Sequence, residues 1–189
     1  MTSIAIPPYV EYAARSLLAL SPVFLDTETS GLRPTDEIAE IAIIDTDGTT
    51  LFESLVRPQQ PMDPEAVAVH GLTDESLADC PTWAEISDTV SAILANRHVV
   101  AHCASFDADM LRQTAERAGV PPANAAAFEC TMQLLLPLQP HRPRLSLKRA
   151  MALIGISGEG LPGKAHRAAY DAHCCRRLLF AAAGVPLAA

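Results

Sequence analysis

Four acidic residues adjoin short apolar runs in three separate parts of the chain, and their grouping predicts a metal site. Asp26 and Glu28 lie in "PVFLDTET", and residues two apart in an extended strand point to the same face. Asp107 comes soon after the apolar run "HVVAH", and Asp171 lies in an Ala-rich helical pattern. Crowded carboxylates repel one another and resist burial, and a divalent cation relieves both effects. Oxygen ligands suit Mg²⁺ or Mn²⁺, and two such ions serve phosphoryl displacement.

A histidine close to the fourth acid supplies a candidate base. His166 and Asp171 are five positions apart in "GKAHRAAYDAHCC", which on one regular helix would separate them by about 140°. The Gly- and Pro-rich segment before His166 instead predicts a loop, so that the histidine lies on the loop and Asp171 on the helix. An imidazole accepts a proton from water near neutral pH. We therefore interpret His166 as the general base of a hydrolytic site and Asp171 as a metal ligand.

These assignments have structural alternatives that the residues alone leave open. Asp26 could simply begin a turn, and Asp107 could simply stabilise the N-terminus of its helix. A zinc site built from His173, Cys174 and Cys175 lacks a fourth ligand and the usual spacing. We interpret those three residues as packing or surface positions of the helix.

The elements that must position these side chains follow from the periodicity of the apolar residues. Strands are expected at residues 22–26, 37–45, 48–58, 98–102 and 126–131, the first three as an antiparallel meander. Helices are expected at residues 9–20, 81–97, 105–119, 144–155 and 166–184, with Ser105 as an N-cap and the Pro-rich residues 136–144 as a loop. This order predicts an α/β fold with a mixed sheet covered by helices.

Composition restricts the class of protein. The chain has 189 residues, a net charge of −8 and an odd number of cysteines, five, and it has no apolar run of membrane-spanning length and no secretory signal pattern. We therefore expect one main domain, reduced thiols and a cytoplasmic location. Residues 1–141 carry 20 acidic and 6 basic side chains, whereas residues 142–189 carry 2 acidic and 8 basic ones. The basic quarter is either solvated surface or the approach for a polyanion.

Taken together, the motifs resemble those of the DnaQ-like 3′–5′ exonucleases of the DEDDh type, a family that includes the proofreading epsilon subunit of bacterial DNA polymerase III. The resemblance rests on "FLDTETSGL", "HCASFDADML" and "HRAAYDA", with "PMDPEAVAVHGLTDESL" between the first two, and covers about residues 22–182. It implies a ribonuclease-H-like sheet and two divalent cations, Mg²⁺ or Mn²⁺. The implied ligands are Asp26, Glu28, Asp107 and Asp171, with His166 as general base.

The resemblance also implies contacts with substrate. Glu65 and His70 match positions that contact the terminal nucleotide, and the remaining implied positions are Thr27, Leu32, Cys103 and Phe106. As alternatives, Glu65 is a solvated acid of a short helix and His70 caps local structure. Cys103 stands where the family has Asn, and a thiol replaces an amide poorly as a hydrogen-bonding group. The departure affects the expected substrate affinity and not the metal site.

The sequence thus predicts a metal-dependent 3′–5′ exonuclease that releases nucleoside 5′-monophosphates from single-stranded DNA. Two alternatives stay open: an RNA-trimming enzyme of the same fold, and a weakly catalytic subunit that binds a polymerase. The expected partner is nucleic acid with a free 3′ end, with a DNA polymerase as an open possibility and no membrane. The expected organisation is a helical appendage at residues 1–21, the exonuclease domain at 22–182 and a tail at 183–189.

Overall fold

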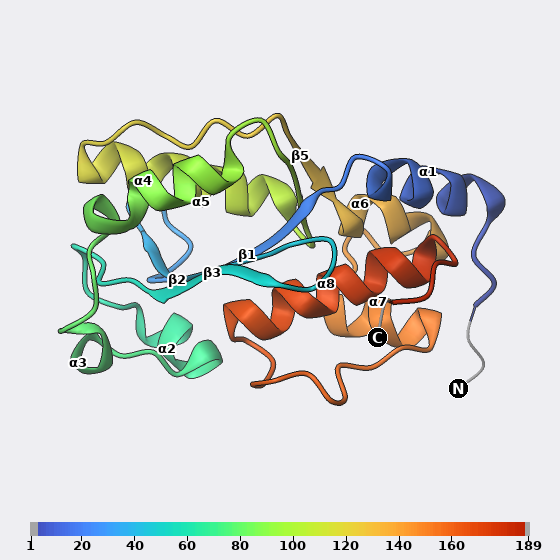
Figure 1. Cartoon of the computed structure of the whole chain (residues 1–189). Helices are drawn as coiled ribbons and strands as arrows, with labels where there is room; N and C mark the ends of the chain where they lie inside the picture. Colours follow the sequence, from blue (N-terminus) through green and yellow to red (C-terminus); the bar gives the residue numbers. More distant parts are fainter. Residues whose placement is uncertain (1–3, 188–189) are drawn as a thin grey trace.

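Five strands form one mixed sheet in the order β3-β2-β1-β4-β5, seen at the centre of Figure 1. The structure is a computed structural model that describes residues 4–187, so residues 1–3 of the expected appendage and 188–189 of the expected tail lie outside the described residues. The first three strands pair antiparallel, and β1–β4 and β4–β5 pair parallel. The strands are β1 (Val23–Thr29), β2 (Ile38–Ile44), β3 (Thr50–Leu55), β4 (His98–Ala101) and β5 (Ala127–Cys130).

Helices cover both faces of this sheet (Figure 1). The helical elements are α1 (Pro8–Leu18), α2 (Pro64–His70), α3 (Asp74–Leu77), α4 (Trp83–Leu94), α5 (Ala104–Ala118), α6 (Thr131–Leu135), the 3₁₀ turn η1 (Leu136–Leu138), α7 (Leu147–Ile154) and α8 (Ala168–Ala182). The expected meander and the expected α/β fold with a mixed sheet are confirmed.

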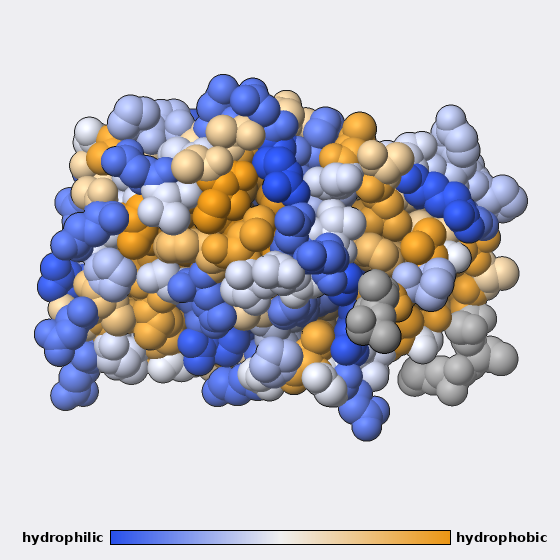
Figure 2. Space-filling model, viewed as in Figure 1, coloured by the Kyte–Doolittle hydropathy of each residue, from blue (hydrophilic) through white to orange (hydrophobic). Residues whose placement is uncertain are grey.

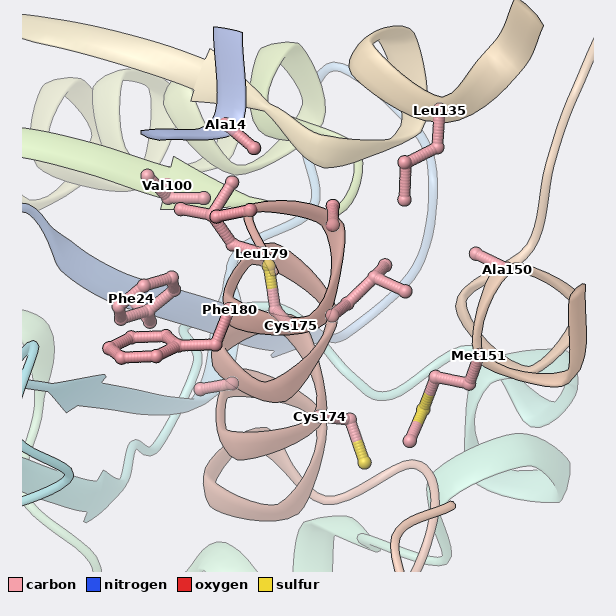
Figure 3. Close-up of a cluster of buried hydrophobic side chains, with 14 of the residues drawn as sticks. Ala14, Phe24, Val100, Leu135, Ala150, Met151, Cys174, Cys175, Leu179 and Phe180 are labelled. Carbon is pink, nitrogen blue, oxygen red and sulfur yellow. The ribbon is translucent and has the colours of Figure 1, made fainter. Parts of the chain in front are cut away.

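The two sides of the sheet have separate cores, because alternate residues of a strand face opposite ways. Phe24 and Val100 of the sheet meet Leu179 and Phe180 of α8 on one side, as Figure 3 shows. Leu25 and the other residues of opposite parity pack under α4 and α5. Burial on both faces explains why β2, "IAEIAII", is almost wholly apolar. Asp26 and Glu28, which share the parity of Phe24, therefore belong to the α8 side.

Three expectations about where helices begin or lie are wrong. Helix α5 begins at Ala104 with Cys103 as its N-cap, so Ser105 is already helical. Helix α8 begins at Ala168, because Arg167 is extended and His166 has a left-handed φ of 62°. The Pro-rich loop starts with η1, and α6 before it was not expected; both are too short to produce a helical period in the sequence.

Hydrophilic and apolar areas alternate on the molecular surface. On the face seen in Figure 2, a central band of hydrophilic residues separates two areas of apolar surface. Within the part of the chain that the structure describes, no helix is both long enough and apolar enough to span a bilayer.

Candidate active site

Strand β1 presents its two acids toward α8. Asp26 pairs with Ala42 and Glu28 pairs with Glu40 in the antiparallel register of β1 and β2. Residues that pair across strands share a face, so Asp26, Glu28 and Glu40 point the same way. The expectation that Asp26 and Glu28 project together is therefore confirmed by the register, and a third carboxylate joins them.

Helix α5 brings the third predicted acid to the same end of β1. Asp107 lies in the first turn of α5 and is 4% exposed. The hydroxyl of Thr27, the β1 residue between Asp26 and Glu28, donates a hydrogen bond of 2.9 Å to Asp107 Oδ1. A buried carboxylate needs such a donor, and here it comes from within the first sequence motif.

The junction before α8 carries the histidine and the fourth acid. The His166 backbone N–H donates a 3.0 Å hydrogen bond to Asp171 Oδ2, across the start of the helix. Asp171 lies in the first turn of α8. One ligand atom each from Glu28, His166 and Asp171 lie within 4.8 Å of one another. The expected division into loop histidine and helix aspartate is what the structure has.

The carboxylates strain one another electrostatically. Burial, followed by the charges of Asp171, Glu40 and Asp107, raises the pKa of Glu28 from 4.5 to about 8. Burial raises the pKa of Asp107 to about 7, against the hydrogen bond from Thr27. The pKa of Asp26 is raised well above its usual value, by burial and then by Asp107 and Asp171. Burial also raises the pKa of Asp171, and the His166 N–H opposes that shift.

This donor set fits divalent cations. Burial and the like charges of their neighbours raise the pKa values of Asp26 and Glu28, and the Arg167 guanidinium opposes the shift of Glu28. A divalent cation would offset this negative charge. Oxygen donors match Mg²⁺ and Mn²⁺, so the residues present are suited to the group that the resemblance implies.

A cavity of about 450 Å³ opens beside Glu28. Glu28 belongs both to the acidic cluster and to the cavity wall, so the cavity and the cluster are continuous. Five of the six residues expected to contact substrate line it: Thr27, Leu32, Glu65, His70 and Phe106. Cys103 does not belong to that wall. Two apolar residues of the wall, Leu32 and Val69, are 84% and 55% exposed, which makes them available to a ligand.

His70 uses both ring nitrogens within the protein. Its Nδ1 accepts a 3.0 Å hydrogen bond from the Leu72 N–H, and its Nε2 lies 3.1 Å from the carbonyl oxygen of Thr29. The neutral Nε2–H tautomer satisfies both partners. The alternative that His70 caps local structure therefore holds for its two ring nitrogens. The flat surface of the ring is what His70 presents to the cavity.

Sequence reasoning missed Glu40, and part of the basic quarter has partners within the protein. Glu40 is 1% exposed and pairs with Arg167 at 2.6 Å. Arg176 is buried over Phe180, and Arg177 donates to two backbone carbonyls of residues 157–159. The side chains of these three arginines thus contact other parts of the protein. A glutamate inside the apolar run "IAEIAII" was the available signal, because a buried acid requires a partner.

Comparisons with known proteins agree on one family. The model of the RNase T exonuclease family matches residues 23–179. The chain is 32% identical over 178 residues to an uncharacterized exonuclease, CP81, of Escherichia phage 186, with 90% of each chain covered. It is 34% identical over 158 residues to exodeoxyribonuclease 10 of Escherichia coli strain K12, over 82% of this chain and 65% of that one.

A solved structure gives the same relationship in three dimensions. Exonuclease X in complex with 5′ overhanging duplex DNA aligns with a TM-score of 0.66 and 31% identity, over 87% of this chain and 94% of that chain. The expected ribonuclease-H-like fold is thereby confirmed.

Proposed function

The chain belongs to the RNase T and DnaQ-like exonuclease family of hydrolases, and from this premise we propose that it is a metal-dependent 3′–5′ exonuclease acting on single-stranded DNA ends. One observation carries the proposal. The acidic cluster of Asp26, Glu28, Asp107 and Asp171 adjoins a cavity of about 450 Å³, and Glu28 belongs to both. A terminal nucleotide held in the cavity would have its phosphodiester beside the cluster.

The four acids would hold two divalent cations. The chemistry that such ions supply in hydrolysis is acidification of the attacking water and neutralisation of charge on phosphate oxygens. Without them the same carboxylates would repel a phosphate, because Asp107 is buried and Asp26 is crowded against the charges of Asp107 and Asp171. Substrate binding and the cluster of acids are compatible only when that charge is offset.

His166 would accept the proton of the attacking water at a ring nitrogen. Its ring lies within 4.8 Å of ligand atoms of Glu28 and Asp171, so it borders the place where the water would sit. The side chain is exposed on a loop, and its backbone is held by the bond to Asp171. It can therefore exchange the proton with solvent after each turnover.

The cavity favours a single unpaired nucleotide. Phe106, Leu32 and Val69 supply apolar surface for a base, and Glu65 is an exposed carboxylate able to accept a hydrogen bond from a sugar hydroxyl. A base can enter only after leaving its pair, which costs a few kcal/mol in a duplex and less at a single-stranded end. DNA is preferred over RNA in this proposal because of the names of two relatives, an exodeoxyribonuclease and an exonuclease solved with DNA. No surface of the described residues identifies a polymerase, so none is included.

A direct assay tests the proposal. Single-stranded DNA, duplex DNA and RNA of one sequence, each labelled at the 5′ end, are incubated with protein and Mn²⁺ or Mg²⁺. A ladder that shortens from the 3′ end, fastest on single-stranded DNA, is the expected result, with unlabelled nucleoside 5′-monophosphates as product. Excess chelator and the Asp26→Asn variant should both abolish it. Immediate release of the label as mononucleotide would mean the opposite polarity, and a faster RNA ladder would favour the RNA-trimming alternative.

A further inference from the structure

Glu40 is a buried acid with three hydrogen-bond donors around it. It lies in the middle of β2, where every residue is buried, and it is 1% exposed. Its carboxylate accepts from Arg167 Nε at 3.0 Å to both oxygens and from Arg167 Nη2 at 2.6 Å. The backbone N–H of Ala168 donates a further bond of 3.0 Å to Oε2. Such paired geometry is what a charge removed from water requires.

The two partners join segments 127 positions apart in the chain. Arg167 is the N-cap residue of α8, and Ala168 is the first residue of that helix. Glu40 stands directly opposite Glu28 in the strand register. The Glu40–Arg167 ion pair therefore fixes the start of α8 against the strand that flanks the acidic residues of β1.

The residue before Arg167 needs such support. His166 has a φ of 62°, a left-handed conformation that side chains other than glycine adopt at an energetic cost. Its own N–H is bound to Asp171, and the side chain of the next residue and the N–H of the one after it are bound to Glu40. The backbone around His166 is thus held from both sides.

We propose that Glu40 and Arg167 are positioning residues: their ion pair fixes the loop-to-helix junction so that His166 and Asp171 stand over Glu28. The kinetic part of this inference rests on the proposed exonuclease function, and the conformational part does not. Arg167 is in this respect a support for the site and not one of its phosphate contacts.

A role in phosphate binding predicts different behaviour. A lysine or arginine that neutralises a phosphate of a single strand contributes about −0.7 to the slope of log K against log salt. Because the guanidinium is already bound to Glu40 through Nε and Nη2, we expect the Arg167→Gln change to leave that slope unchanged. The slope is measured on single-stranded DNA with Ca²⁺ in place of Mg²⁺ and in a His166→Ala background, so that the acidic cluster is neutralised and no cleavage occurs.

Kinetics on 5′-labelled single-stranded DNA with Mn²⁺ form the first arm of the test. The Arg167→Gln variant should lose at least tenfold in kcat with KM within twofold, because the reacting groups are displaced and the cavity is intact. The Arg167→Lys variant should be intermediate, since lysine keeps the charge and loses the forked contact. Arg15→Gln, which removes an exposed ion pair with Glu11 on α1, is the matched control and should keep full activity.

Amide hydrogen exchange of the full chain, in chelator and without DNA, forms the second arm and needs no activity. The peptide spanning residues 160–172 should exchange faster in Arg167→Gln, while peptides from β1 and α5 stay as in the unmodified protein. The Arg167→Gln variant leaves the carboxylate of Glu40 buried without its partner, which can destabilise the fold by itself. The double variant Glu40→Gln/Arg167→Gln removes both charges and is therefore taken through the same kinetic and exchange measurements.

Three results would overturn the proposal: unchanged kcat in the Arg167→Gln and double variants, faster exchange spread over the whole chain in proportion to the lost activity, or a salt slope reduced by about 0.7 with unchanged exchange. If the unmodified protein degrades no nucleic acid, the proposed function fails. The exchange arm then still decides whether the ion pair orders the junction.

Discussion

The acidic residues of the site carry negative charge that the neighbouring side chains only partly neutralise. Glu40 is paired with Arg167, whereas within residues 4–187 Asp26, Glu28 and Asp107 form no ion pair, and the pKa values of these three are raised mainly by burial. The buried and crowded carboxylates therefore lower the free energy of unfolding of the metal-free protein, at the place where cations would bind. This trade has consequences that can be measured without a substrate.

Metal-free protein should lose stability as pH rises from 6.5 to 8.5. In the unfolded chain these carboxyls titrate near pH 4, whereas the folded protein keeps Asp107 and Glu28 protonated up to about 7 and 8. The folded state therefore binds more protons in this window, and the free energy of unfolding falls by roughly 2 kcal/mol from Glu28 alone. Melting curves in chelator across this range check the effect.

Two comparisons make this result specific. Glu28→Gln should flatten the dependence, and Mn²⁺ should reverse it, because metal binding favours ionised ligands. A melting temperature in chelator that rises toward pH 8.5 would contradict the charge distribution described here.

Cys103 and Phe106 lie one helical turn apart in the chain but should behave differently. The Phe106 ring lines the cavity and Cys103 does not. Phe106→Ala should therefore weaken inhibition by a nucleoside 5′-monophosphate about tenfold, as expected for loss of an aromatic contact. Cys103→Asn should leave that inhibition constant unchanged. An inhibition constant that improves in Cys103→Asn would support the expectation from the sequence that this position affects substrate affinity.

At the scale of elements, the turn after β1 determines how Leu32 is presented to the cavity. Gly31 packs against the Asp36 carboxylate, which also accepts a 2.6 Å hydrogen bond from the Arg33 N–H. A methyl group at residue 31 would collide with that carboxylate, so the loop is closed around a position without a side chain.

Gly31→Ala should displace this turn. We expect a loss of about 1–3 kcal/mol in unfolding free energy, the usual cost of overpacking, and a several-fold higher KM because Leu32 moves. Pro34→Ala, at an exposed position of the same turn, is the control and should change KM little. Urea denaturation and steady-state kinetics provide the two measurements. Wild-type KM in the Gly31→Ala variant would mean that the turn does not shape the cavity.

At the scale of the whole molecule, α1 shares the core of the α8 side. Val10 and Ala14 of α1 are buried in the cluster that contains Phe24 and Leu179. The family model begins at residue 23, after this helix. We propose that residues 22–182 are the exonuclease domain and that α1 is a support for α8, with no role in the reaction.

Two substitutions on α1 separate packing from surface. Val10 is 1% exposed and Tyr12 is 75% exposed. Val10→Ala should cost about 1–3 kcal/mol of unfolding free energy, and Tyr12→Ala should stay within about 0.5 kcal/mol. Both variants should keep the kcat of the unmodified protein at a temperature where they are folded. A loss of kcat in Tyr12→Ala would give the exposed face of α1 a function that its packing does not suggest.

Much of the fold followed from short-range pattern, because the periods of strands and helices are local properties. All five strands and the five long helices were expected at nearly the observed positions, and the two acids of β1 share a face since residues two apart always do. The helical elements η1, α3 and α6, of three to five residues, were missed because they are too short to show a helical period. The resemblance of the motifs added the family, which the comparisons confirm.

By itself, the sequence determined which residue types are present for the chemistry and which short segment carries each of them. Only the tertiary structure decided what those side chains touch. The Glu40–Arg167 pair joins positions 127 apart, His70 turns its nitrogens to the backbone, and Cys103 lies outside the cavity wall. The physical reason is that periodicity fixes the face of an element on which a residue lies, whereas the partner on that face is chosen by how α8, α5 and the sheet pack together.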